Sequence, residues 1–401
     1  MKNTLRKSAF ALVAALLVAF VPARTLKSLF DRAEQQTRLL LNDLATVLAQ
    51  QPSGKPMLVS PRTLTAEGAL QAVPARDWTS GFFPGELWYL YEYTGKQEWA
   101  DQARRFTARL EGEKTNAGTH DMGFKLYSSY GNGYRLTRDP AYRAVIIDAA
   151  RTLSKRFKPT AGIIRSWDHH KEVWDCPVII DNMMNLELLF AATRLTGDST
   201  FYHLADTHAR TTMKHHFRAD NSSYHVVDYD TLTGKVLKKN THQGFSDESA
   251  WARGQAWGLY GYTVCYRETK DARYLKQAEA IARFMLNHPH MPADLVPYYD
   301  FDAPGIPNEP RDVSAAAVMA SALFELSTYV PGSSYRAKAE QVIGSLAKNY
   351  ASPTGKNHGF LLLHSTGAKT FERDVPLIYA DYYYLEALLR AKKIGEKKPL
   401  F

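Results

Sequence analysis

Cysteine is almost absent from this sequence, since only Cys176 and Cys265 occur among 401 residues. Two cysteines exclude the disulfide framework that stabilises many small secreted domains. One bridge between them is compatible with the count, but its spacing gives no argument for it. Neither has the histidine or asparagine context of a catalytic thiol. We therefore expect two buried free thiols.

Clusters of basic residues interleaved with aromatic residues are also missing, which argues against a nucleic-acid-binding protein. The formal net charge is +9, and charged residues make up 23% of the chain. With 45% hydrophobic residues, the chain can bury a large core, so disorder is excluded. A mildly basic surface suits an acidic ligand, although a basic surface without a partner explains the charge equally well.

A long apolar run is lacking everywhere except at the N-terminus, where residues 9–21 follow the basic residues Lys2, Arg6 and Lys7. This run is too short for a comfortable membrane span, and Val21-Pro22-Ala23 resembles a cleavage site. We expect residues 1–23 to be a signal peptide and the mature protein to be periplasmic, without a membrane span. Removing them lowers the net charge from +9 to +6. An uncleaved N-terminal anchor is the alternative.

The histidine pairs lack the features of a metal site. His169-His170 and His215-His216 have no carboxylate or third ligand at the spacing of a zinc site. We therefore expect no metal there.

One pattern occurs five times along the chain. An apolar, aromatic-rich helix ends in a short turn, and an aromatic residue begins the second helix. The turns are Thr94-Gly95, Thr137-Arg138, Thr196-Gly197, Thr269-Lys270 and Val330-Pro331, and the aromatic residues are Trp99, Tyr142, Phe201, Tyr274 and Tyr335. In four cases an alanine follows four residues later, on the same helix face, which allows close packing on the preceding helix. Turns of this length predict antiparallel helix pairs.

Two further helices are expected near residues 26–48 and 376–391, which makes about twelve helices in six pairs. Six pairs can stack as an open solenoid or close into a ring, and the uneven loops favour a ring with a functional rim. Strand signals are confined to residues 359–364 and 224–230. The fold class is therefore all-α, with one domain over residues 24–401.

The unusual residues are concentrated in four segments between the helix pairs. These segments are residues 76–85, 119–124, 165–185 and 242–257, and they combine tryptophan, aspartate and histidine with Arg253. Each precedes a helix, so all should lie on one rim of the ring. Indole rings stack on sugars, an arginine can form a fork with a carboxylate, and sugar hydrolysis generally needs two carboxyl groups. The combination favours a sugar acid as ligand.

Asp121 and Asp181 are the candidate carboxyl groups, but both stand at expected helix starts, where aspartate is a common N-cap. A helix N-terminus lowers a carboxyl pKa, whereas a general acid needs a raised one. A nearby second carboxylate or apolar surroundings would oppose the helix effect. For each tryptophan, core packing is the alternative to sugar binding.

Three motifs together resemble those of unsaturated glucuronyl hydrolases, glycoside hydrolase family 88. They are His120-Asp121-Met122-Gly123-Phe124, Ile180-Asp181-Asn182-Met183-Met184-Asn185, and the segment from Asp247-Glu248-Ser249 to Trp251-Ala252-Arg253-Gly254-Gln255-Ala256-Trp257. The resemblance extends from Trp78 to Tyr379-Ala380-Asp381-Tyr382. It implies an (α/α)6 barrel, a toroid of six helical hairpins. It also implies that Asp181 is the catalytic acid/base and Asp121 its partner, and that the substrate contacts are Trp78, His120, Trp167, His225, Gln243, Arg253 and Trp257.

The chemistry that the resemblance implies is hydration of an enol ether, without a metal or organic cofactor. Asp181 would protonate C4 of a 4,5-unsaturated glucuronic acid, and water would add at C5. An ionised Asp121 would stabilise the cation that develops there. The hemiketal would then open and release the next sugar. The substrate is thus expected to be an unsaturated oligosaccharide cut from a glycosaminoglycan by a lyase.

Two alternatives remain open. One is an unsaturated rhamnogalacturonyl hydrolase that acts on pectin fragments with the same ring. The other is a non-catalytic protein that binds acidic glycans, against which the presence of both Asp121 and Asp181 argues. In addition, Ser365 and Lys369 in the loop of residues 364–369 are expected near the leaving sugar, where they would contact a sulfate. Ordinary residues of an exposed turn are the alternative there.

Overall fold

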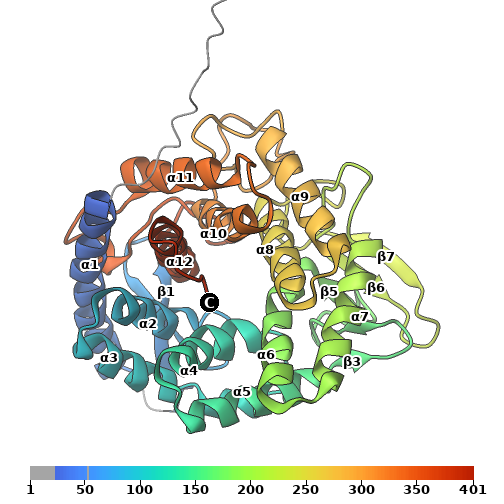
Figure 1. The fold of residues 1–401 in the computed structure, drawn as a ribbon, viewed down its shortest axis with the longest axis horizontal. Coiled ribbons are helices and arrows are strands. Elements are labelled where there is room, and N and C mark those ends of the chain that lie inside the picture. Colours follow the sequence, from blue (N-terminus) through green and yellow to red (C-terminus); the bar gives the residue numbers. More distant parts are fainter. Residues whose placement is uncertain (1–22, 52–53) are drawn as a thin grey trace, which may run out of the picture.

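Twelve α-helices form two concentric layers in the computed structural model, which describes residues 23–51 and 54–401 (Figure 1). The inner helices are α2 (Phe82–Thr94), α4 (Asn132–Thr137), α6 (Leu186–Thr196), α8 (Ala252–Thr269), α10 (Val313–Tyr329) and α12 (Ile378–Gly395). The outer helices are α1 (Ala23–Ala49), α3 (Gln97–Ala108), α5 (Pro140–Ser154), α7 (Ser199–His215), α9 (Ala272–Asn287) and α11 (Tyr335–Ser345). A π-helix, Gly123–Gly131, leads into α4.

The inner helices close into a ring. Each of them, or the π-helix that precedes α4, packs against the next, and α12 packs against α2. The outer helix α1 completes the sixth pair beside α12. The expected all-α fold, an (α/α)6 barrel rather than an open solenoid, is therefore confirmed.

The turn of the repeat has a physical explanation in the threonine hydroxyl. In four of the five turns this hydroxyl donates to the carbonyl oxygen four residues earlier and accepts from the backbone N–H two residues later. The threonines are Thr94, Thr137, Thr196 and Thr269. After three of these turns an aspartate caps the next helix, and these caps are Asp139, Asp198 and Asp271. One hydroxyl thus satisfies backbone groups at the helix end and in the following turn.

The packing predicted for the hairpins is confirmed. Trp99, Phe201, Tyr274 and Tyr335 are buried, and Tyr142 packs edge-on against Tyr130 of the preceding π-helix. The alanine four residues after each of the first four is fully buried. Both cysteines are buried free thiols, as expected.

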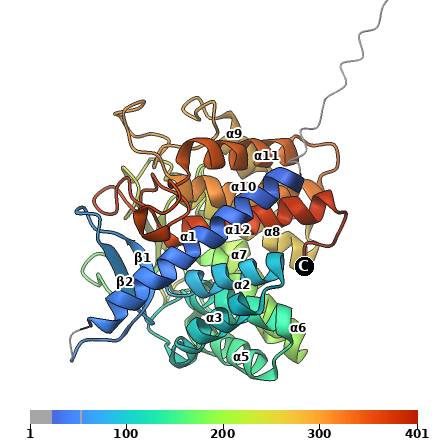
Figure 2. The ribbon, with the colours of Figure 1, turned by 90° about the vertical axis from the view of Figure 1, so that its left-hand side faces the viewer.

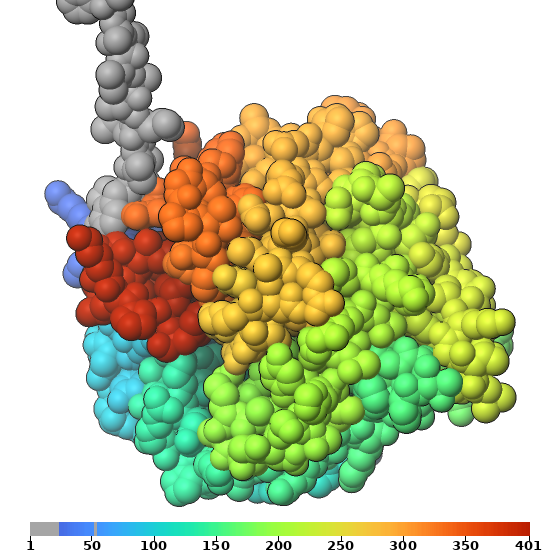
Figure 3. Space-filling view, turned by 45° about the vertical axis from the view of Figure 1, so that its right-hand side comes forward, coloured from blue at the N-terminus to red at the C-terminus, as the bar shows by residue number. Residues whose placement is uncertain are grey.

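Short strands lie in the loops at one end of the ring. The strands β1 (Leu58–Leu64) and β2 (Leu70–Pro74) form a hairpin, and β3 (Phe157–Lys158) pairs with β4 (Ile163–Ile164). A three-stranded antiparallel sheet contains β5 (Pro177–Ile179), β6 (Val226–Tyr229) and β7 (Val236–Asn240) in that order. It forms part of a projecting side of the molecule (Figures 1 and 3). Short helical turns cover Glu111–Thr115, Ile180–Asn185, Leu346–Tyr350 and Asn357–Gly359.

The predicted strand at residues 224–230 is confirmed by β6, but the one at residues 359–364 is wrong. There only Leu362 makes an isolated bridge, with Ala351. The backbone N–H groups of Leu361 and Leu362 donate to the carboxylate of Asp381, at 2.8 and 3.0 Å. A buried side chain therefore takes the hydrogen bonds that a neighbouring strand would have taken.

The two ends of the ring differ. The β1–β2 hairpin lies at one end, while the C-terminus lies at the other (Figure 2). Of the signal peptide predicted at residues 1–23, residues 1–22 lie outside the described part of the chain. Within the described part, no helix combines the length and apolarity needed to cross a membrane.

Candidate active site

A pocket of about 170 Å³ lies on the end of the ring that carries the long loops. Seven of the nine predicted site residues line it: Trp78, His120, Asp121, Trp167, Asp181, Gln243 and Arg253. The four loop segments thus converge at one place, as the helix-pair arrangement predicts. The other two predicted residues, His225 and Trp257, lie behind this lining.

Asp181 is positioned by the three-stranded sheet. Strand β5 ends at Ile179, which pairs with Val226 of β6, and the backbone N–H of Ile180 donates to the carbonyl of His225 at 3.0 Å. The 3₁₀ helix that follows carries Asp181 into the pocket, where only 6% of the residue is exposed. Its Oδ2 atom has no hydrogen-bond partner among the described residues. A buried carboxyl oxygen without a partner is costly, which is typical of a functional group.

Burial raises the pKa of Asp181 to about 7. The positive charge of Arg253 opposes this shift, while the negative charge of Asp121 adds to it. Desolvation therefore outweighs the helix N-terminus, and about half of the Asp181 carboxyls carry a proton near neutral pH. Of the two opposing effects expected from the sequence, the buried surroundings thus prevail over the helix N-terminus in setting the pKa of Asp181.

Asp121 lies on the wall of the same pocket and is less buried, with 16% of its side chain exposed. Its Oδ2 accepts a hydrogen bond from the Thr119 hydroxyl at 2.7 Å, and its Oδ1 lies 3.2 Å from His120 Nε2. Neither Asp121 nor Asp181 makes a side-chain cap for the helix that follows it. The N-cap alternative therefore does not account for these two residues.

His120 is buried beside the carboxyl pair. Burial lowers its pKa, so the ring is neutral at pH 7, and neither ring nitrogen has a hydrogen-bond partner among the described residues. A neutral imidazole offers one donor and one acceptor. His120 can therefore accept from one sugar hydroxyl and donate to another oxygen.

His225 is held in one tautomer. Its Nδ1 accepts hydrogen bonds from the backbone N–H groups of His242 and Gln243, at 3.0 and 3.2 Å. The proton must then be on Nε2, which lies 3.7 Å from Asp181 Oδ2. Burial lowers the pKa of His225 well below its usual value. A neutral His225 thus presents an N–H group to the Asp181 carboxyl.

Trp257 is fully buried in the first turns of α8 and packs against Phe124 and Tyr383, with ring centroids 5.1 and 5.4 Å apart. Its side chain contributes to lowering the pKa of Asp181. The structure therefore places Trp257 as a support beneath the pocket, next to the carboxyl.

Arg253 does not present the free fork that an arginine–carboxylate pair requires. Its Nη1 donates to Asp312 Oδ2 at 2.7 Å and to the carbonyl of Thr366 at 2.6 Å. Its Nη2 donates to the carbonyl of Gly367. Only Nε is without a partner among the described residues. Arg253 thus binds the loop of residues 366–367 with its fork and keeps its Nε–H for a ligand.

Several pocket residues were missed from the sequence. They are Arg62, Phe124, His169, Ile179, His242, Phe371, Glu372 and Tyr379. Arg62 comes from β1 and pairs with Asp77 and Glu372, so it joins two distant loops. Tyr379 lies in the first turn of α12, and its buried hydroxyl has no hydrogen-bond partner in the described part of the chain. His242 and Phe124 stand inside the segments that the sequence singled out, whereas nothing in the sequence pointed to Arg62.

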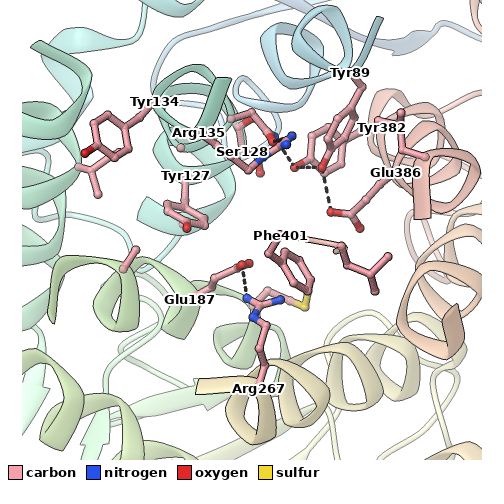
Figure 4. A pocket seen from close by; sticks show the side chains of 18 of the residues that line it. Tyr89, Tyr127, Ser128, Tyr134, Arg135, Glu187, Arg267, Tyr382, Glu386 and Phe401 are labelled. Carbon is pink, nitrogen blue, oxygen red and sulfur yellow. Dashed lines mark hydrogen bonds and ion pairs between the residues drawn. The ribbon is translucent and has the colours of Figure 1, made fainter. Parts of the chain in front are cut away.

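A larger cavity, of about 460 Å³, lies around the C-terminal ends of the inner helices (Figure 4). Arg267 is paired there with Glu187, Glu268 and Glu325. Glu386 accepts hydrogen bonds from Tyr89, Tyr260 and Ser321. The charged groups named here are therefore all paired. Phe401 lies over Arg267, with 4.0 Å between the guanidinium carbon and the ring centroid. This cavity contains none of the predicted site residues.

No group of three or more metal-ligating side chains occurs in residues 23–51 and 54–401. What the loop-end pocket holds instead is a carboxyl pair, indole rings and one arginine N–H. A closed helical ring with such a pocket defines a glycosidase-like enzyme.

The sequence model of Glycosyl Hydrolase Family 88 matches residues 57–395. The unsaturated glucuronyl hydrolase of Formosa agariphila is 50% identical over 341 residues, which are 83% of this chain and 85% of that protein. An unsaturated chondroitin disaccharide hydrolase of Streptococcus pneumoniae is 31% identical over 83% of this chain and 86% of its own. A crystal structure of an unsaturated glucuronyl hydrolase specific for heparin is similar with a TM-score of 0.86 and 48% identity, over 92% of this chain and 98% of that one. The chain therefore belongs to glycoside hydrolase family 88.

Proposed function

We propose that this enzyme removes the terminal 4,5-unsaturated glucuronic acid from oligosaccharides that lyases cut from glycosaminoglycans. The observation that carries the proposal is Asp181, a buried carboxyl with a pKa of about 7, which shares a sugar-sized pocket with Asp121. The relatives named unsaturated glucuronyl hydrolase and unsaturated chondroitin disaccharide hydrolase support the substrate class.

The proposed reaction is hydration of the C4=C5 double bond. The protonated Asp181 transfers its proton to C4, and positive charge develops on C5 and the ring oxygen. Ionised Asp121 stabilises that charge at short range. A water molecule adds its oxygen to C5 and returns a proton to Asp181, which restores the acid. The product is a hemiketal, which opens and releases the next sugar.

The surrounding groups keep Asp181 ready for this step. The neutral His225 faces Asp181 Oδ2 with its N–H, and the free Nε of Arg253 is available to the uronate carboxylate. Trp78 and Trp167 provide apolar faces for the two sugar rings. These roles remain predictions for each residue.

The test is a panel of lyase-generated unsaturated disaccharides, followed by loss of the ultraviolet absorbance of the enol ether. We expect turnover of glycosaminoglycan-derived disaccharides and little turnover of pectin-derived ones. Turnover of the pectin fragments alone would identify a rhamnogalacturonyl hydrolase. Unchanged absorbance on every substrate, together with binding, would identify a glycan-binding protein and overturn the proposal.

We also propose that residues 1–23 are removed during export and that residues 24–401 act as the catalytic domain in the periplasm. The basic start, the apolar run and the small residue Ala23 support this proposal. Mass spectrometry of protein from fractionated cells tests it. A chain that retains residues 1–23, or one found in the cytoplasm, would contradict it.

A further inference from the structure

Three histidines cluster beside Trp167 at the mouth of the pocket, and two of them contact its ring. His169 stacks on the indole with 5.3 Å between ring centroids, and His242 lies 5.2 Å from it at a steep angle. The ring of His170 lies 4.6 Å from His169 and 5.7 Å from His242. These residues come from two loops far apart in the sequence, so the fold itself assembles the cluster.

The position of this histidine rim, defined as His169, His170 and His242, follows from the depth of the pocket. The carboxyl of Asp181 and the side chain of Arg253 are buried at its base, whereas the three histidines are exposed. His169 and His242 line the same pocket as Asp181. A substrate with its unsaturated sugar at the base must therefore place its leaving sugar against Trp167 and the histidine rim.

The two pocket-lining histidines have free ring nitrogens. In the described part of the chain, no hydrogen bond involves the ring of His169 or His242, although both rings make aromatic contacts. His170 differs, because its Nδ1 lies 3.2 Å from Glu172 Oε1. His169 and His242 can thus each give an N–H group to a ligand without breaking a contact within the protein.

The nearby acids leave the rim without a strong negative partner. Asp168 is engaged by Arg156 at 2.7 Å and by Arg165 at 3.3 Å. Glu172 is an exposed side chain beside His170. Asp168 and Glu172 favour protonation of His169, whereas His170 opposes it. For His242, both His169 and His170 oppose protonation. His225 lies behind and is neutral, and Lys238 of β7 donates to the carbonyl of Val173.

We propose that the histidine rim binds an anionic group on the leaving sugar, a sulfate, and that it does so best when its imidazoles are protonated. This inference rests on the proposed function, because it concerns the second sugar of the same substrate. Protonated imidazoles donate from both nitrogens and attract an oxyanion. Two of them beside an indole would recognise a sulfated sugar by charge and by stacking.

The proposal predicts a pH-dependent preference. Partial burial and neighbouring histidines lower the pKa of His169 and His242 below the ordinary value. The cationic form therefore grows as the pH falls below about 6.5. Between pH 7.5 and 5.5, we expect the ratio of kcat/KM for a 6-sulfated over an unsulfated unsaturated chondroitin disaccharide to rise about three- to tenfold, the range for an exposed charge-assisted contact. Taking a ratio cancels the titration of Asp181, which acts on both substrates.

The test uses the full-length enzyme with the double substitution His169→Gln and His242→Gln. We expect the ratio to become independent of pH, whatever kcat/KM the variant keeps for the unsulfated disaccharide, because both histidines line the pocket. His203→Gln is the matched control, because His203 is exposed on the outer helix α7 and should leave the pH-dependent ratio unchanged. Circular dichroism and the melting temperature establish that each variant is folded.

A second variant separates the rim from Lys369, a cation on a neighbouring loop. Lys369 donates to the carbonyl of Phe245 from its exposed loop and is not part of the histidine rim. Lys369→Ala should therefore keep the pH-dependent ratio. A flat ratio in the wild type would overturn the proposal. So would loss of the preference in Lys369→Ala while the double histidine variant keeps it. An enzyme that fails to turn over any unsaturated disaccharide would instead overturn the proposed function.

Discussion

The two cavities of the ring differ in whether their polar groups are satisfied. The larger one, about 460 Å³ at the C-terminal end, is built from buried ion pairs centred on Arg267 and from hydrogen bonds to Glu386 (Figure 4). The smaller one, about 170 Å³ at the end with the long loops, holds Asp181 Oδ2 and both nitrogens of His120 without hydrogen bonds from the described residues. The larger of these two cavities contains none of the predicted site residues, so size does not identify the site.

This difference reflects two uses of buried polar groups. Paired charges in the C-terminal cavity stabilise the ring only if every member is present. Unpaired groups in the loop-end pocket cost stability but are available to a ligand, and a carboxyl there has a pKa near neutrality. Substitutions in the two cavities should therefore have opposite effects on activity and on stability.

Asp181→Asn should have the largest effect on activity. Loss of the general acid should lower kcat at least about a thousandfold. Ionisation of this buried group makes folding less favourable as the pH rises from about 4 toward 7, because the folded state holds the proton more tightly. The variant should therefore melt no lower than the wild type at pH 7. Asp148→Asn, on the outer helix α5, is the control, and more than a tenth of wild-type activity in Asp181→Asn would contradict the assignment.

Arg267→Met should have the opposite signature. The substitution leaves the largely buried Glu187 without its ion-pair partner and Glu325 with Arg390 alone, which should cost about 3–5 kcal/mol in the free energy of unfolding. Arg273→Met, which removes an exposed pair with Asp271, should cost at most about 1 kcal/mol. Urea denaturation gives these values, while kcat of the folded fraction should stay within about twofold of the wild type. A selective loss of kcat would mean that the C-terminal cavity takes part in catalysis.

Asp121→Asn should combine a loss of activity with a shift in pH dependence. Removing the charge that stabilises the developing cation should lower kcat about 10- to 100-fold. The negative charge of Asp121 also contributes to the raised pKa of Asp181. Without it that pKa falls, so the loss of activity at alkaline pH, which begins near pH 7 in the wild type, should start at a lower pH. A pH–kcat profile that keeps the wild-type alkaline limb would show that the two carboxyl groups are not coupled.

Deletion of Phe401 should have the smallest effect. The ring lies over Arg267 and Arg390, at 4.0 and 5.4 Å, but is about half exposed. Such a contact contributes about 0.5–1 kcal/mol. We expect a small decrease in the midpoint of urea unfolding and unchanged kinetics. A larger loss, comparable with that of Arg267→Met, would mean that the C-terminal residue belongs to the ion-pair network.

The repeat predicted the ring because its signals are local. A turn with an aromatic residue five positions later recurs in all five hairpins, and in four of them a threonine hydroxyl closes the turn by bonding within the hairpin. The closing of the ring has no such local signal, because the contact between α12 and α2 joins helices from the two ends of the chain. The strand expected at residues 359–364 failed for the same reason, because its backbone N–H groups bind Asp381, about twenty residues away.

The candidate site was predicted as a set of loop residues, but not as a geometry. The convergence of Asp121 and Asp181 follows from helix pairs arranged around one axis. The fork of Arg253 was misjudged, because its partners are the carbonyls of Thr366 and Gly367 and a carboxylate on α10. Arg62 was missed because it lies in a hairpin at the beginning of the chain, and only the fold brings it to Glu372.

The contacts of Arg253 and Gln243 with residues 366–367 have a consequence for biosynthesis. Both residues are made more than a hundred positions before the loop that they bind. The contacts that form the pocket therefore join residues far apart in the sequence. A chain that has emerged only as far as α10 lacks one wall of the site and the last inner helix of the barrel, α12. Catalytic competence should appear in a single late step, when α12 docks between α10 and α2. A nascent or truncated chain would be inert toward its substrate.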